Sequence, residues 1–530
     1  MRKFIHTGFA ILSAICMFSA NLVAAADLKI GYKAEVTSAD PHVLNGNNRN
    51  VWAHVYEPLV YQDERLRPTP ALAVSWRSTG GSSWEFKLRP NVKFHNGAVM
   101  TAEDVKFSIE RAMHLSGPRT FRGYLKDVDT ISIPAPLTIQ VKTKIPSPTL
   151  PDALGLIAVV PKSIGEGATE ESFATGKSAI GTGPYKYVSW AHGQRVVLAR
   201  NPDYWGPKEP WDNVSFQFIP REPSRVTAML SESVDLIDGV TTNLLESLSN
   251  SKKIDTVSTT SYMLTYLVLD QYRDHSPYIK ANDGSPLNKN PLRDLKVRQA
   301  LMTAINREGM IKFLMKGDAI ASEQLVPDGF FGHDASMKPS GNDLAKAKKL
   351  LAEAGYPDGF KMTMHCPNNR YVNDAKLCEA VAQVFNQIGI KTDVTTMPFS
   401  VYQARKENAD GQAEFSVFMI GYGAVTGDSL TGLNAMIHSP DKKGGWGSIN
   451  YGGYSNKQVD ALIEKASQMM NEKERETLQK QAMKLALSEG AIIPLVQLNS
   501  TWAVRKGLTF KPRADGFTMA MDIREAKAAN

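Results

Sequence analysis

Residues 83–112 read SWEFKLRPNVKFHNGAVMTAEDVKFSIERA, and this stretch decides the fold of its part of the chain. Apolar residues first alternate with charged ones, as in a half-buried strand: Trp84, Phe86 and Leu88. Val92 and Phe94 repeat the alternation before Asn96 and Gly97, a pair typical of hairpin turns. The pattern predicts two strands and a turn.

A helix should follow this turn. Thr101 occupies the position of an N-cap, and Asp104, three residues later, supplies the acidic half of a capping box. An apolar stripe with helical spacing begins directly afterwards: Val105, Ile109 and Ala112. None of these strand, turn and helix signals is catalytic.

The whole stretch resembles the signature segment of extracytoplasmic solute-binding proteins of the dipeptide, oligopeptide and nickel group, the receptors of ABC importers. The resemblance extends over nearly all of the chain after its amino terminus. Four further segments match landmarks of this family in the same order: GTGPY (181–185), ARNPDYW (199–205), NPLRDLKVRQA (290–300) and LLAEAGYPDG (350–359). Each also predicts local structure, such as a helix capped by Asp343 and ended by Gly355.

The amino terminus indicates secretion. Arg2 and Lys3 precede an apolar segment at 9–18, and the small residues of 23–26 form a cleavage site, so residues 1–26 are predicted to be a signal peptide. The apolar run is shorter than the ~20 residues that a spanning helix needs. A lipoprotein site at Cys16 is disfavoured because Ile15 precedes it. The predicted compartment is the periplasm.

Two cysteines remain after this signal, Cys366 and Cys378. An even number in an oxidising compartment favours a disulfide between them, which would contribute about 3 kcal/mol by closing a short loop. A metal site using His365 and Cys366 is the alternative, but no further ligands fall at zinc spacing. We therefore expect no metal and no other cofactor.

Length and composition fit a large two-lobed α/β protein. The chain has 530 residues and a formal charge of +7, without the basic clusters of a nucleic-acid-binding protein. The resemblance implies a two-lobe periplasmic binding protein fold, with an extra domain in the first lobe and a hinge of two crossing strands near 262–270 and 491–498. The implied first lobe comprises 27–60, 175–265 and 495–530, the additional domain 61–174, and the second lobe 266–494.

Enzyme interpretations fail on spacing. Residues 175–178 (TGKS) look like the end of a Walker loop, but Glu171 stands where the first glycine is required and a strand rather than a helix is predicted next. His95 is a turn histidine by its context, although a general base was the alternative. A secreted hydrolase would need a nucleophile that the sequence does not supply.

The loop at 421–430 (GYGAVTGDSL) is the first candidate for ligand contact, because it follows an apolar strand predicted at 415–420. In peptide-binding relatives the matching loop carries an aromatic residue and an acid that pairs with the ligand's amino group. Tyr422 stands at the aromatic position, but Val425 stands at that acid. Asp428 is the nearest substitute, or else a turn residue, and Thr426 is a further candidate. A buried ammonium without its acid costs several kcal/mol.

Two other loops are candidates. Arg370 lies in a polar turn before a helix predicted at 375–388, and its planar fork suits a carboxylate or phosphate, although a solvated cation is the alternative. Asn373 or Asp374 would cap that helix. Asn45 lies in a polar loop that resembles the cleft-facing loop of the first lobe.

These observations predict a monomeric receptor, not an enzyme, that captures a small solute between two lobes. It would deliver the solute to an ABC permease of two membrane subunits and two ATPase subunits. Closure would be driven by ligand contacts made to both lobes. A short peptide is the expected ligand, and an opine, an oligosaccharide or a metal chelate is the alternative.

Overall fold

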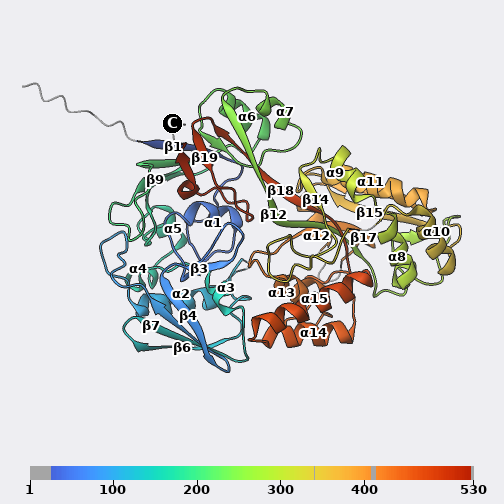
Figure 1. Cartoon of the computed structure of the whole chain (residues 1–530), viewed down its shortest axis with the longest axis horizontal. Coiled ribbons are helices and arrows are strands. Elements are labelled where there is room, and N and C mark those ends of the chain that lie inside the picture. The colour runs from blue at the N-terminus through green and yellow to red at the C-terminus, as the bar shows by residue number, and fades with distance from the viewer. Residues whose placement is uncertain (1–25, 118, 340, 407–412, 527–530) are drawn as a thin grey trace, which may run out of the picture.

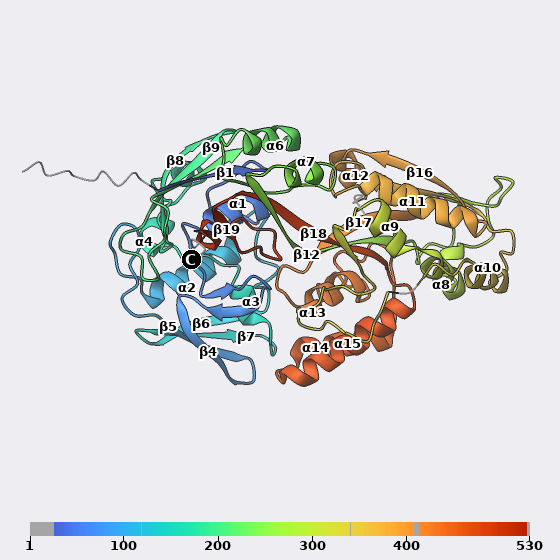
Figure 2. The same ribbon diagram turned by 45° about the horizontal axis from the view of Figure 1, so that its top comes forward.

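The computed structural model describes residues 26–117, 119–339, 341–406 and 413–526, so the predicted signal peptide lies outside the described residues except for Ala26. The described chain forms two lobes that are joined by the long strands β12 (Ile254–Leu269) and β18 (Ile493–Arg505), as Figures 1 and 2 show from two directions. No helix among these residues has the length and apolar character that a membrane span requires.

A mixed sheet of twelve strands runs through both lobes in the order β13-β15-β17-β12-β18-β11-β1-β10-β9-β8, with β14 paired to β18 and β16 to β15. Its other strands are β1 (Asp27–Tyr32), β8 (Tyr185–Ala191), β9 (Arg195–Arg200), β10 (Asn213–Phe218), β11 (Leu236–Ile237), β13 (Ile279–Lys280), β14 (Ala319–Ala321), β15 (Lys361–Pro367), β16 (Lys391–Met397) and β17 (Val417–Gly423). The parallel pair β1 and β10 brings the amino terminus into the first lobe.

The two connecting strands pair with each other along most of their length. Their antiparallel register runs from Ile254 opposite Arg505 to Leu267 opposite Ile493, and it shifts near Thr260 and again at Thr265. Every residue from Leu264 to Leu269 is buried. The prediction of buried strands at 262–270 and 491–498 is confirmed, except that β18 begins at Ile493.

Residues of the expected additional domain form a separate sheet in the order β4-β5-β7-β6. Its strands are β4 (Ala73–Gly80), β5 (Ser83–Leu88), β6 (Val128–Ala135) and β7 (Thr138–Thr143), and α2 (Ala102–His114) packs on it. Helix α2 begins as predicted, because the Asp104 carboxylate accepts the Thr101 backbone N–H at 2.8 Å. These elements share a hydrophobic cluster, which supports the additional domain.

The second strand predicted in the opening stretch does not form, although the predicted turn at Asn96 and Gly97 does and closes one antiparallel bridge between Lys93 and Val99. Val92 and Phe94 are buried, but they lie in a turn whose backbone bonds within itself and to another loop. Phe94 N–H donates to Ala98 O at 2.8 Å, and His95 N–H donates to Gly181 O at 2.9 Å. The partners of β5 are instead β4 and β7, which short-range alternation cannot identify.

The remaining elements are mostly short. The helices are α1 (Gly46–Trp52), α3 (Leu150–Leu154), α4 (Lys162–Gly165), α5 (Glu170–Ala174), α6 (Glu222–Leu230), α7 (Leu245–Ser249), α8 (Leu295–Ala304), α9 (Arg307–Phe313), α10 (Leu344–Glu353), α11 (Asp374–Gln387), α12 (Phe399–Lys406), α13 (Ser429–Gly432), α14 (Lys457–Gln468) and α15 (Glu472–Ser488), with single turns at η1 (Pro291–Arg293), η2 (Leu433–Ile437) and η3 (Ala520–Asp522). Short strands are β2 (Val60–Gln62), β3 (Pro68–Pro70), β19 (Leu508–Phe510) and β20 (Ile523–Glu525). The predicted caps of α10 are confirmed, because Asp343 accepts Lys346 N–H and Gly355 has φ +89°.

One buried carboxylate joins two of the landmark segments. Glu57 is fully buried and accepts four hydrogen bonds of 2.7–2.9 Å from Tyr61, Thr182, Tyr204 and Trp205. All four donors are neutral, so burial raises the pKa of Glu57. The landmarks at 181–185 and 199–205 therefore meet around one acid in the first lobe.

Candidate functional site

Two glycines of β17 build an aromatic wall between the lobes. A Cβ atom at Gly423 would lie 2.0 Å from the Tyr262 ring, and one at Gly421 would lie 2.5 Å from the Tyr371 ring. Gly421 N–H also donates to the Tyr371 hydroxyl at 2.9 Å. The segment predicted as a cleft loop thus begins as strand, and its glycines let two tyrosine rings lie against it.

Four polar side chains from four separate parts of the fold are linked by electrostatic interactions, and we call them the inter-lobe cluster: Arg49 of α1, Tyr124 of the expected additional domain, Tyr262 of β12, whose ring is part of this wall, and Tyr422 of β17. Burial raises the pKa of Tyr262 to about 12, and the charges of Asp515, Arg49, Tyr124 and Arg370 also act on it. Burial raises the pKa of Tyr422 well above 10, and Tyr124 adds to this effect. Arg49, Tyr124 and Tyr262 therefore lie within electrostatic range of one another, and Tyr422 is linked to them through Tyr124.

The polar groups of this cluster are poorly satisfied. The buried Tyr422 hydroxyl has no hydrogen-bond partner. Arg49, Tyr124 and Tyr262 are only half-buried, and in the described part of the chain their side-chain polar groups make no hydrogen bond to the protein. Buried polar groups are normally paired within a protein. Unpaired groups contributed by both lobes and by a connecting strand are what a ligand enclosed there would satisfy.

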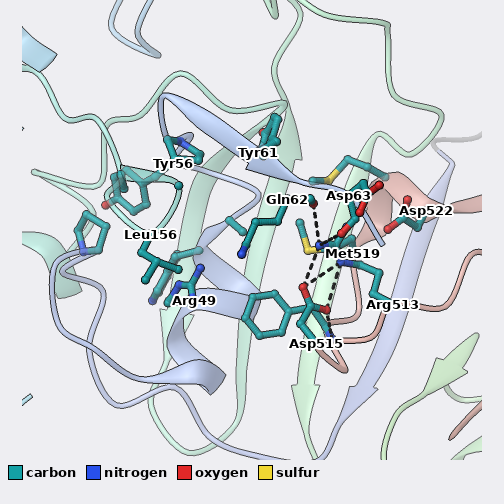
Figure 3. A pocket seen from close by; sticks show the side chains of 18 of the residues that line it. Arg49, Tyr56, Tyr61, Gln62, Asp63, Leu156, Arg513, Asp515, Met519 and Asp522 are labelled. Carbon is teal, nitrogen blue, oxygen red and sulfur yellow. Dashed lines mark hydrogen bonds and ion pairs between the residues drawn. The ribbon is translucent and has the colours of Figure 1, made fainter. Parts of the chain in front are cut away.

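A cavity of about 380 Å³ opens beside Arg49. Figure 3 shows Arg49, Tyr56, Gln62, Leu156 and the ion pair between Arg513 and Asp515 around it. Its size falls in the range of small-molecule pockets. All its lining residues belong to the expected first lobe, and Gln62 on its rim reaches the second lobe by donating to Val425 O at 2.9 Å.

Val425 is half-buried at this inter-lobe contact. The polar side chains of Thr426 and Asp428 interact with other side chains of the protein. The Thr426 hydroxyl lies 2.7 Å from that of Thr431. Asp428 is 4% exposed, caps α13 by accepting Leu430 N–H at 2.8 Å, and pairs with Arg475. The carboxylate of Asp428 therefore already has partners within the second lobe.

The two other predicted loops border the cluster. Arg370 is exposed, with its guanidinium 5.1 Å from the Phe399 ring centre. Asn373 has φ +55° and forms no cap bond, whereas the Asp374 carboxylate accepts the N–H groups of Arg370 and Tyr371. Asn45 caps α1 by accepting Asn47 N–H at 2.9 Å. It thereby fixes the helix that carries Arg49.

Cys366 and Cys378 are bonded to each other, as predicted, and both are fully buried. The bond joins β15 to α11 on either side of the Arg370 turn. His365 stacks on Phe415 with ring centres 4.2 Å apart, and burial lowers its pKa to about 4. No group of three or more His, Cys, Asp or Glu residues in the described chain is placed to hold a metal.

The structural features on which the enzyme alternatives rested have other roles. His95 is a turn histidine as predicted: its ring Nε2 lies 3.0 Å from Gly183 O, and burial lowers its pKa to about 4. The segment at 175–178 follows α5 and leads into β8, so no helix starts there to hold a phosphate.

The fold and the inter-lobe cluster define a two-lobe solute receptor. The sequence model for bacterial extracellular solute-binding proteins, family 5, matches residues 67–444. The glutathione-binding protein GsiB of Escherichia coli K12 is 27% identical over 508 residues, covering 94% of this chain and 93% of GsiB. The chain belongs to the family 5 bacterial extracellular solute-binding proteins, the receptors of ABC importers.

Solved structures of similar proteins confirm the two-lobe fold. DppA of Helicobacter pylori, in complex with the peptide STSA, has a TM-score of 0.75 and 24% identity over 95% of this chain and 99% of its own. NikZ of Campylobacter jejuni, in complex with Ni(L-His), has a TM-score of 0.77 and 22% identity over 95% of this chain and 100% of its own.

Proposed function

We propose that this protein captures a short peptide at the inter-lobe cluster and delivers it to an ABC permease. The observation that carries the proposal is the meeting of unpaired polar groups from both lobes and from β12. The resemblance to a glutathione-binding protein over nearly the whole chain supports a small peptide as the ligand. Binding without catalysis, as a monomer in the periplasm, fits this role.

The lobe boundaries near 265 and 495, and those of the additional domain near 61 and 174, are part of the same proposal. Strands β12 and β18 form the hinge, and their register shifts at Thr260 and Thr265 remove regular pairing where the lobes join. A ligand that contacts both lobes only in the closed form would stabilise closure by that difference in affinity.

We assign ligand contact to Tyr422, Val425 and Arg370, and supporting roles to Asn45, Thr426 and Asp428. Val425 is the residue that favours the alternative, a non-peptide solute such as an opine, an oligosaccharide or a metal chelate, because it provides no acid for a peptide's amino group. A metal chelate is what NikZ holds, on a similar fold.

Two measurements test the proposal. Mass spectrometry of small molecules that co-purify with the secreted protein should find short peptides, and recovery of an opine or a sugar instead would favour the alternative. Adding the recovered molecule to refolded protein should reduce the radius of gyration in X-ray scattering and raise the melting temperature with concentration. Binding without compaction would refute the hinge.

A further inference from the structure

Arg49 differs from the other arginines that burial affects. Burial lowers the pKa of four arginines: Arg49, Arg225, Arg298 and Arg307. The other three guanidinium groups donate to backbone carbonyls, with bonds such as Arg225 Nη1 to Ile219 O at 2.8 Å. Within the described residues, the Arg49 guanidinium has neither a hydrogen bond nor an ion pair, and its one recorded contact is the Phe517 ring at 5.7 Å.

Among the described residues, no carboxylate lies within ion-pair distance of this cation, although several line the same cavity. Asp515 is the carboxylate whose charge acts most on Arg49, but Arg513 Nη2 donates to Asp515 at 2.8 Å and Phe517 N–H donates to it at 2.9 Å. Arg49 is half-buried, and a cation held partly out of water without a partner is unfavourable. The position of Arg49 beside a cavity is explained if the ligand supplies the anionic partner.

Resting on the proposed function of this site, we propose that Arg49 binds a free carboxylate of the ligand and thereby selects carboxylate-bearing solutes. The guanidinium fork matches a carboxylate with two parallel hydrogen bonds. Tyr124 and Tyr262, whose hydroxyls are also unpaired, lie within electrostatic range of Arg49.

The polarity of the site follows from Arg49 and Val425 together. The first lobe offers a cation, and the position that holds an amino-group acid in peptide-binding relatives is apolar here. A peptide should therefore depend on its carboxyl terminus and be indifferent to whether its amino terminus is free.

Calorimetry on refolded, ligand-free protein tests this with glutathione and with trialanine in its free, carboxamide and N-acetyl forms. Amidation of trialanine and Arg49→Met should each weaken binding about tenfold to hundredfold. The two losses should not add, because both remove the same contact. Acetylation should change affinity less than about threefold, and Arg49→Lys should recover part of the loss. The control Arg195→Met removes an exposed cation of β9 and should change nothing.

Retention of the preference for free over amidated trialanine in Arg49→Met would overturn the inference while leaving peptide binding intact. If no peptide binds, the proposed function fails. The melting temperature of the ligand-free protein then tests whether Arg49 lacks a partner within the protein. Arg49→Met should then melt at the same or a higher temperature than the natural protein, because an unpaired, half-buried cation has been removed. A fall of more than about 2 °C would show that Arg49 is held by the protein itself and would overturn the inference.

Discussion

Replacing Arg475 by methionine should destabilise the protein strongly, although Arg475 lies outside the inter-lobe cluster. Asp428 and Arg475 are 4% and 9% exposed. The substitution removes the guanidinium that pairs with the Asp428 carboxylate and leaves the hydrogen bond from Leu430 N–H. Removing one partner of a buried ion pair costs about 3–5 kcal/mol. With an unfolding entropy of about 2.1 cal/mol/K per residue over about 500 residues, the melting temperature should fall by about 3–5 °C.

Differential scanning calorimetry of Arg475→Met, Asp428→Asn and the double variant measures this coupling. The double variant should be more stable than the sum of the single changes implies, because no unpaired buried charge remains. An unchanged melting temperature in Asp428→Asn, together with loss of binding to peptides with free amino groups, would refute the reasoning. Asp428 would then be the acid that replaces the one missing at Val425.

Three further outcomes are expected. Burial raises the pKa of Asp152 to about 7, and the charge of nearby Asp428 adds to this effect. The folded state therefore holds the Asp152 proton more tightly than the unfolded state, so this proton stabilises the fold fully below about pH 4 and progressively less up to about pH 7. The difference in melting temperature between pH 5 and pH 8 should therefore shrink in Asp152→Asn. Reduction of the bond between Cys366 and Cys378 should lower the unfolding free energy by about 3 kcal/mol, and thiol titration of unfolded, unreduced protein should find no free thiol. Gly423→Ala should displace the Tyr262 ring and weaken ligand binding at least about tenfold in calorimetry.

Each of these outcomes has a matched contrary result. Gly167→Ala is the control for Gly423→Ala, because a Cβ atom at Gly167 meets no atom within 4 Å. Equal ligand binding in both alanine variants would show that Tyr262 does not contact the ligand. An unchanged pH dependence in Asp152→Asn would mean that the Asp152 carboxyl group is solvated. Two free thiols in the unreduced protein would contradict the disulfide.

Local patterns were sufficient to predict much of the fold. The capping box of Thr101 and Asp104, the strands at 262–270 and 491–498, and the cap at Asp343 each depend on residues close together in sequence. The strand expected at Val92 and Phe94 is reduced to one bridge between Lys93 and Val99, because the backbone groups of Val92 and Phe94 bond to residues just past the turn. Alternation of apolar and polar residues indicates which side chains are buried, but it does not identify the hydrogen-bond partners of the backbone.

The candidate site was less predictable. Tyr422 could be placed from its segment, but nothing in GNNRNVW (46–52) marks Arg49, whose importance depends on how α1 lies against Asp515 far along the chain. Asp428 had two interpretations from its sequence, and its ion pair depends on Arg475, 47 residues away. The signal that could have been used is Gly421-Tyr422-Gly423, because glycines on both sides of an aromatic residue in a strand indicate that other groups approach the backbone closely.

The disulfide between β15 and α11 affects how much loop entropy ligand binding would lose. The turn that carries Arg370 is anchored covalently by Cys366 and Cys378 and is tied internally by the Asp374 carboxylate. Loops that become ordered during binding reduce affinity by the entropy they lose. Here that entropy is lost when the chain folds and the disulfide forms, so a ligand that binds Arg370 as proposed would meet a preorganised turn, and formation of the disulfide would become a determinant of affinity.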